Sequence, residues 1–380
     1  FNLKSEDLCD GSSLKYSFNA SGSQPSKNFT CADVPNGVSA IIPLKMYVID
    51  EDGNSEFCDV KLILQDSPNK NACPNTGNLT ATVSGKVVNK TATGFENIAV
   101  DLKNMNDASS MQSTTAGEGK FNFKDVPYFN EYQLKAVKND DILNGLSTLD
   151  LVLIQRHILG MKHIENPYDL IAADINKDKK LTASDLVGLR KVILGIDKQF
   201  ASNESWRFVP SNYVFADPRD PHNFPEGIDI NELSQDMENL DFTAVKTGDV
   251  NNSATYNARN AEAENRTSPA LLLIADQAYK TGETVRASVS AGESMEVSGI
   301  QYAVKIDESK FLFKGIESAV LKVGSDNFHY SNGVLKLSVD SREAQMIQSG
   351  DVVFHIIMES KKAGNSINLT IDEQALAAEM

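Results

Sequence analysis

Catalytic signatures are absent from this sequence. It contains no Gly-x-Ser-x-Gly nucleophile motif, no His-Glu-x-x-His zinc-peptidase motif and no phosphate-binding loop, and its five histidines are scattered. Paired carboxylates such as Asp217 and Asp220 occur in a proline-rich stretch that would not hold them at a fixed separation. We therefore expect that the protein is not an enzyme.

Long apolar runs and excess positive charge are also missing. No hydrophobic segment approaches the ~20 residues that a membrane-spanning helix requires. The net charge of −16 argues against nucleic acid and anionic membrane surfaces as partners. The chain has 380 residues, of which 41% are hydrophobic. This length is typical of a globular protein with about three to four domains.

Cysteine is confined to the first 73 residues. An even number of cysteines in one small domain predicts two disulfides and an oxidising compartment, so we expect an extracellular location, secreted or on the cell surface. Strand-like residues precede Cys31 and Cys58, which favours a Cys31–Cys58 bond together with Cys9–Cys73, although three connectivities are open. The sequence begins without a signal peptide, so we expect that a leader was processed or that this is a segment of a longer chain.

Acceptor motifs for N-linked glycans recur along the chain. A sequence rich in Asn, Ser and Thr produces several by chance, so the motifs show only that surface glycans are permitted. They occur at Asn19, Asn28, Asn78, Asn89, Asn203, Asn251, Asn265 and Asn368.

One pattern is written twice between residues 139 and 195. The motif Leu-Ser/Thr-x-x-Asp-Leu-Val begins at Leu146 and again at Leu181, and the two copies end in Ile-Leu-Gly at Gly160 and Gly195. Matched residues are 35 positions apart, so the segment is an internal duplication. Each copy is predicted to be a polar loop that feeds a helix.

The loop of the second copy has oxygen-bearing groups at alternate positions. This is the 1-3-5-7-9-12 spacing with which an EF-hand-type loop surrounds Ca²⁺. Lys179 stands where glycine usually makes the turn, and a positive φ there would cost about 1 kcal/mol. The alternative is an acidic, solvated turn without a metal. The predicted ligands are Asp174, Asn176, Asp178, the carbonyl of Lys180, Thr182 and Asp185.

The loop of the first copy is irregular. Leu143 stands at its fifth position, where an oxygen ligand is expected, so Asn144 or Asp140 would have to substitute. Asp249 and Asn251, in a closing Gly-Asp-Val-Asn, are further candidates to donate oxygens to this loop, and a capped turn without a metal is the alternative. The predicted ligands are Asn139, Asp141, Asn144, Ser147 and Asp150.

The two loop–helix copies together resemble dockerin, the duplicated calcium-binding module that docks onto cohesin domains. An extended form of the resemblance continues through Ser-Trp-Arg-Phe at residues 205–208 to the closing Gly-Asp-Val-Asn, so we place this domain at 139–256. The resemblance implies Ca²⁺ as cofactor, a cohesin-like partner and a set of exposed partner-binding residues. These are Thr148, Leu149, Gln155, Arg156, Ala183, Ser184, Arg190 and Lys191.

The remaining segments alternate apolar and polar residues between turns, which predicts β-strands. Residues 1–75, with Tyr-Val-Ile-Asp-x-x-Gly-Asn at 47–54, resemble hyalin-type immunoglobulin-like repeats. Residues 78–138, with Gly-Lys-Phe-x-Phe at 119–123, resemble carboxypeptidase-regulatory-like sandwiches. A polar linker at 257–268 precedes residues 269–380, whose Gly-Ile-Gln-Tyr at 299–302 and strand rhythm resemble a cohesin-type jelly roll. The expected fold is therefore multi-domain and mainly β, with a small helical centre.

Two functions fit this organisation. The first is a calcium-stabilised extracellular structural protein, a fibre subunit that polymerises head to tail by strand or domain complementation. The terminal β-modules favour it, because they lack a clear leading strand at one end and a closing strand at the other. The second is an accessory or adhesion region of a secreted enzyme or adhesin that docks to a partner through dockerin–cohesin-type contacts.

Overall fold

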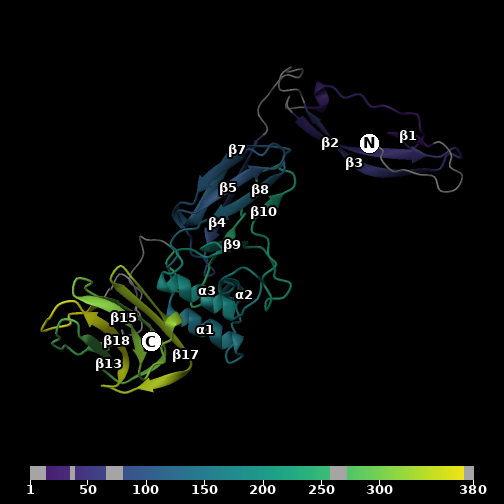
Figure 1. Cartoon of the computed structure of the whole chain (residues 1–380). Helices are drawn as coiled ribbons and strands as arrows, with labels where there is room; N and C mark the ends of the chain where they lie inside the picture. The colour runs from purple at the N-terminus through teal and green to yellow at the C-terminus, as the bar shows by residue number, and fades with distance from the viewer. Residues whose placement is uncertain (1–13, 35–38, 66–79, 257–271, 372–380) are drawn as a thin grey trace.

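The computed structural model describes residues 14–34, 39–65, 80–256 and 272–371, and these residues are mainly β with three α-helices. They form an elongated arrangement, with a small sheet at one end, a β-sandwich carrying the helices in the middle and a second sandwich at the other end (Figure 1). In the described part of the chain, no helix is long and apolar enough to cross a membrane.

The N-terminal sheet has three antiparallel strands in the order β1-β2-β3. They are β1 (Lys15–Ser17), β2 (Ser39–Ile49) and β3 (Ser55–Gln65), and β2 and β3 form a hairpin around the acidic, glycine-containing turn at 50–54. Cys31 is disulfide-bonded, whereas Cys58 is an exposed free thiol. The predicted Cys31–Cys58 bond is therefore wrong, because β3 presents Cys58 to solvent; Cys9 and Cys73 lie outside the described residues.

The middle sandwich consists of two four-stranded sheets, β10-β8-β5-β6 and β7-β4-β11-β9. Strands β9 to β11 come from the segment that the sequence placed with the helices, and β11 pairs in parallel with β4. Trp206 is buried in the shared core, with its ring centroid 4.7 Å from that of Phe95. The strands are β4 (Thr80–Val88), β5 (Ala99–Asn104), β6 (Ser110–Thr114), β7 (Lys120–Pro127), β8 (Tyr132–Val137), β9 (Trp206–Pro210), β10 (Ile228–Ile230) and β11 (Phe242–Lys246).

The helices lie between β8 and β9 in the chain and pack on one end of this sandwich. They are α1 (Thr148–Ile158), α2 (Pro167–Ala173) and α3 (Ala183–Leu194). Apolar side chains at helical spacing, such as Ile154 and Leu189, form their common core. The Asn-Pro-Tyr at 166–168 starts α2, because the Asn166 side chain caps it and proline is tolerated in the first turn.

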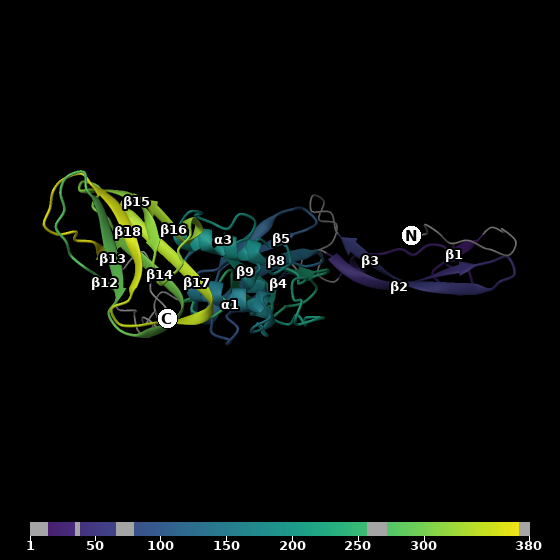
Figure 2. The ribbon, with the colours of Figure 1, turned by 60° about the horizontal axis from the view of Figure 1, so that its bottom comes forward.

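The C-terminal sandwich consists of the sheets β12-β13-β18-β15 and β16-β17-β14-β19. Its face formed by β14 and β17 is covered by α1, so the helices are held between the two sandwiches (Figure 2). The strands are β12 (Leu272–Ile274), β13 (Thr284–Ala291), β14 (Met295–Lys305), β15 (Phe311–Ser318), β16 (Phe328–Ser331), β17 (Val334–Ile347), β18 (Val352–Ser360) and β19 (Thr370–Ile371).

Candidate functional site

The second loop has the wrapped backbone that its spacing predicts. The two oxygens of Asp174 accept the amide protons of Asp178 and Lys179, each at 3.1 Å. Asn176 Oδ1 also accepts the amide proton of Asp178, at 2.9 Å. Lys177 and Lys179 have φ values of 61° and 69°, so the strained turn expected at Lys179 is present. These bonds fold the loop around its own acidic side chains.

Asp185 closes this loop from the first turn of α3. Its Oδ1 accepts the amide protons of Ile175 at 2.9 Å and Asn176 at 3.3 Å. Its Oδ2 accepts the amide proton of Thr182 at 2.9 Å, which also caps the helix. The loop and the helix are thus joined through one buried carboxylate.

The equivalent of this loop in the first copy is split between two distant segments. Asp150 Oδ1 accepts the amide protons of Val250 at 2.9 Å and Asn251 at 3.2 Å, and its Oδ2 accepts that of Ser147 at 2.9 Å. These are the bonds that Asp185 makes with residues 175, 176 and 182. Asp150 therefore closes a loop that begins at Asp249, not one that begins at residue 139.

Residues 249–254 repeat the hydrogen bonds of 174–179. Asp249 accepts the amide protons of Ser253 at 3.0 Å and Ala254 at 2.9 Å, and Asn251 Oδ1 accepts that of Ser253 at 3.0 Å. Asn252 has a φ of 65°, close to the 61° of Lys177. Gly145 lets the two segments meet, because a Cβ there would lie 2.6 Å from the Cα of Ala254. The first loop is therefore assembled from residues 249–255 and 147–150.

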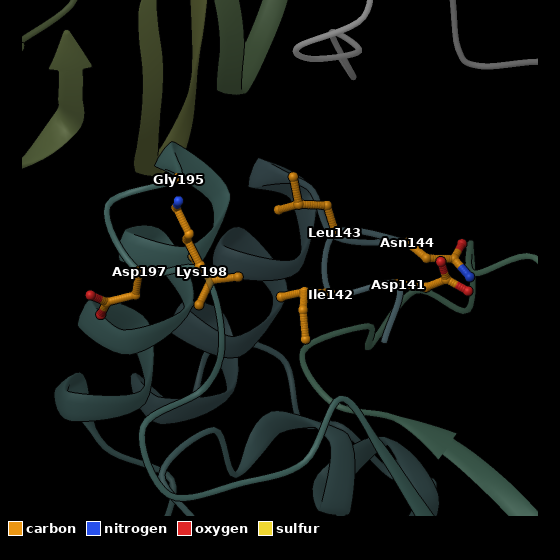
Figure 3. Close-up of a pocket in the computed structure, with 8 residues that line it drawn as sticks. Asp141, Ile142, Leu143, Asn144, Gly195, Asp197 and Lys198 are labelled. Carbon is orange, nitrogen blue, oxygen red and sulfur yellow. The ribbon is translucent and has the colours of Figure 1, made fainter. Parts of the chain in front are cut away.

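The residues predicted to begin the first loop have other partners. Asn139 Oδ1 accepts the amide proton of Ser205 at 2.8 Å, and Asp141 lies 3.5 Å from the Lys138 ammonium. Figure 3 shows Asp141 and Asn144 on one side of a pocket whose other side is formed by residues at the end of α3. Asn144 does contact the split loop, since its amide donates to the Thr255 carbonyl at 2.8 Å.

The split loop contains two buried acids, as the second loop does with Asp174 and Asp185. Asp150 and Asp249 are both buried, and burial raises the pKa of both carboxyls, that of Asp249 to about 6. The negative charge of Asp249 raises the pKa of Asp150 further. Burial lowers the pKa of the neighbouring Lys246 to about 7. Two adjacent buried carboxylates are stable only if one keeps a proton or a cation lies near both.

Among the described residues, no three His, Cys, Asp or Glu side chains are grouped so as to hold a metal ion. Ca²⁺ loops also use amide, hydroxyl and backbone oxygens. Here these are Asn176, Thr182 and the Lys180 carbonyl in the second loop, and Asn251 and Ser147 in the split loop. Both loops carry the residue types for Ca²⁺, and the metal assignment stays a prediction.

The helices dock on the chain's own C-terminal sandwich through buried polar side chains. The amide of Thr148 donates to Gln301 Oε1 at 2.8 Å, and the Thr148 hydroxyl lies 2.7 Å from that of Ser338. All three side chains are buried. Thr148 was expected to be exposed, and it is buried because β14 and β17 cover it. Each buried polar group thus has its partner in the other domain.

A second cluster joins the other ends of the helices to the same sheet. Arg190 forms an ion pair with Asp340, and Gln155 Nε2 donates to Asp340 Oδ2 at 3.2 Å. Arg156 donates to the Ser298 hydroxyl at 2.9 Å. A Cβ on Gly299 would lie 2.8 Å from Thr148 Cγ2, so glycine allows this close approach.

The eight predicted partner-binding residues divide into two groups. Thr148, Gln155, Arg156 and Arg190 contact the C-terminal sandwich, as described above. Leu149 is half-buried, and Ala183, Ser184 and Lys191 are exposed. The sequence did not predict that Gln301, Ser338 and Asp340 contact the first group. The only available signal was that polar residues stand on one face of predicted strands in the cohesin-like segment.

The predicted glycan acceptors also differ in accessibility. Asn28 and Asn368 are exposed, and Asn19, Asn89 and Asn251 are half-buried. Asn203 is buried and its amide donates to the Asp174 carbonyl at 2.9 Å, so it is not a surface acceptor in this fold. Asn78 and Asn265 lie outside the described residues.

Comparison with known proteins gives no family assignment. No family model and no curated protein matches the chain. Among solved structures, it is similar to a type I cohesin–dockerin complex from Clostridium thermocellum, with 14% identity and a TM-score of 0.22 over 29% of this chain and 92% of that chain. It is similar to the third ScaC cohesin bound to the ScaB dockerin from Acetivibrio cellulolyticus, with 18% identity and a TM-score of 0.24 over 28% of this chain and 83% of that chain.

The full-length major pilin SpaD from Corynebacterium diphtheriae is a third neighbour. It has 8% identity and a TM-score of 0.22 over 75% of this chain and 56% of that chain. All three scores lie below 0.5, so we infer nothing about function from these neighbours.

Proposed function

We propose that the chain is a non-catalytic extracellular structural protein whose helical centre is stabilised by calcium and locked onto its own C-terminal sandwich. The observation that carries this proposal is the buried polar contact of Thr148 with Gln301 and Ser338. A dockerin-type surface that is occupied by its own chain serves to stiffen that chain. It is not free on this face to recruit a separate partner.

Calcium would act at both loops. In the second loop it would be held by Asp174, Asn176, Asp178, Lys180, Thr182 and Asp185. In the split loop, Asp249 and Asn251 would take the places first assigned to Asn139 and Asp141, and Ser147 and Asp150 would keep theirs. The ion would neutralise the buried Asp150 and Asp249 and thereby fix the start of α1, which carries Thr148 into the interface. Docking should therefore depend on calcium.

Assembly into a fibre is supported by the open sheet edges. Within the described residues, the long edge strand β3 pairs only with β2, and most of its side chains are exposed. In the same residues, β14 pairs with β19 only at Val304 and Lys305. Such edges accept a strand from a neighbour. Contacts of that kind between unlike surfaces generate filaments when the rotation does not close.

A second candidate is docking of a separate cohesin-like partner on α3. It is favoured by the exposure of Ala183, Ser184 and Lys191. A pull-down with a cohesin array distinguishes the two, since capture that persists after Ala183 and Ser184 are replaced by Asp would exclude this surface.

Hydrogen exchange of the full chain with and without calcium tests the main proposal. We expect amides at 299–303 and 336–340 to exchange more slowly with calcium than after chelation, because α1 covers them only when the split loop is closed. Equal exchange in both conditions would contradict calcium-dependent docking. Electron microscopy in calcium tests assembly: filaments are expected, and dispersed monomers at all concentrations would exclude the fibre.

A further inference from the structure

A buried histidine from outside the loop–helix repeat faces the second loop. His222 lies in the irregular segment between β9 and β10, and its side chain is only 6% exposed. Its Nδ1 lies 3.5 Å from Asp174 Oδ2 but has no hydrogen-bond partner among the described residues. A buried nitrogen aimed at a buried carboxylate, without a hydrogen bond to it, leaves the imidazole incompletely satisfied, whereas Asp174 accepts two amide protons of its own loop.

Several contacts hold this segment over the loop. Lys179 Nζ donates to Asn223 Oδ1 at 2.7 Å, and Lys177 Nζ donates to Glu226 at 3.0 Å. Arg207 donates to the same Glu226 carboxylate at 2.6 Å. Asn223 and Glu226, which follow His222 in this segment, are thus tied to the second loop or to β9. The position of the imidazole is therefore set by the fold, not by a flexible side chain.

We propose that His222 Nδ1 and Asp174 Oδ2 form part of a binding site for a borderline transition cation of the Zn²⁺ class. Metal–nitrogen and metal–oxygen bonds of about 2.1 Å at a tetrahedral angle place the two ligand atoms about 3.4 Å apart. The observed separation is 3.5 Å. A neutral imidazole with a carboxylate suits Zn²⁺ or Co²⁺, whereas Ca²⁺ takes oxygen ligands almost exclusively. Solvent or other loop oxygens would complete the shell.

This site shares Asp174 with the calcium set proposed for the second loop, so the two ions would compete there; docking and the split loop do not use His222. It adds a second kind of metal to the chain, at a loop whose spacing alone predicts only calcium. No sequence spacing predicts this site, since 48 positions separate His222 from Asp174.

Co²⁺ titration of the calcium-free full chain tests the site, with visible absorption as the readout. We expect intense tetrahedral bands in the wild-type chain, and at least a tenfold loss of Co²⁺ affinity with loss of these bands in His222→Ala. The matched control is His163→Ala, an exposed histidine, which should behave as wild type. Wild-type bands and affinity in His222→Ala would overturn the proposal.

A second measurement covers the case in which His222→Ala does not fold. In the wild-type chain, Co²⁺ should shift the imidazole resonances of His222 before those of the other four histidines. The His222 signals are identified by their loss in His222→Gln. An unshifted His222 at saturating Co²⁺ would overturn the proposal. Hydrogen exchange at 336–340 in calcium, measured on the same samples, reports separately on docking.

Discussion

The carboxylate of Asp150 accepts the amide proton of Val250 at 2.9 Å, although 100 residues separate them in the chain. Asp185 makes the same bond to Ile175 within one continuous loop. The two loops thus share their hydrogen bonding and differ in connectivity. Closing the split loop joins the start of α1 to the segment that follows β11. It therefore restricts the conformational freedom of the chain between these two points.

Replacing Asp249 should have opposite effects with and without calcium. Asp249→Asn removes one of two adjacent buried acids, so we expect a higher melting temperature in chelator than for the wild type. In calcium the variant should lose about tenfold in affinity for one ion, about 1.4 kcal/mol. Asp59→Asn, at an exposed position, is the control. A change of the same sign in both conditions would count against an ion at this loop.

Gly299 should be essential for docking. A side chain there would press on Thr148 and Val152, so we expect Gly299→Val to cost about 1–3 kcal/mol of interdomain stability. Hydrogen exchange at 336–340 measures this directly. Gly117→Ala is the control, because a Cβ at Gly117 meets no atom within 4 Å. Unchanged protection in Gly299→Val would mean that α1 does not sit against β14.

The interdomain ion pair should be worth more than a surface pair. The side chains of Asp340 and Arg190 are 3% and 17% exposed. Arg190→Ala leaves Asp340 buried without its counter-charge, so we expect a loss of about 3 kcal/mol or more in unfolding free energy. Arg286→Ala, in the exposed pair with Glu317, should lose less than about 1 kcal/mol. Equal losses would contradict a buried interface.

Stability of the calcium-free chain should have a minimum near neutral pH. The pKa of Asp249 is raised to about 6, so the folded state holds this proton more tightly, and stability should fall as pH rises from about 4 to 6. The pKa of Lys246 is lowered to about 7, so its buried positive charge destabilises the fold below pH 7. The free energy of unfolding should therefore increase as pH rises above 7 and Lys246 loses its proton in the folded state. Denaturant unfolding across pH measures both limbs.

One variant and one solution condition assign these limbs. Lys246→Met should flatten the alkaline limb, and saturating calcium should flatten the acidic one, because the ion replaces the proton at the carboxylates. An acidic limb that is unchanged in calcium would indicate that the ion does not contact Asp249.

The sequence was informative where its signals are local. The 35-residue repeat predicts α1, α3 and the second loop, and strand rhythm predicts most of the C-terminal sandwich. Strands β9 and β11 are buried at every position, so they lack the alternation that assigns a strand to a sheet face. Oxygen ligands from Asp249 and Asn251 were only an alternative for the first loop, because motif spacing describes continuous loops. Asp249 lies far from Asp150 in the sequence. In the sequence, Gln301 and Ser338 have the pattern of solvent-facing strand residues, so nothing in the sequence indicates that α1 packs on them.

Calcium stoichiometry of Asp249→Ala, measured by titration calorimetry beside Asn139→Ala, tests the central claim most directly. The split loop predicts two ions for the wild type, two for Asn139→Ala and one for Asp249→Ala. Two ions in Asp249→Ala with one in Asn139→Ala would return the first site to the continuous loop, and no calcium binding by the wild type would contradict the account altogether.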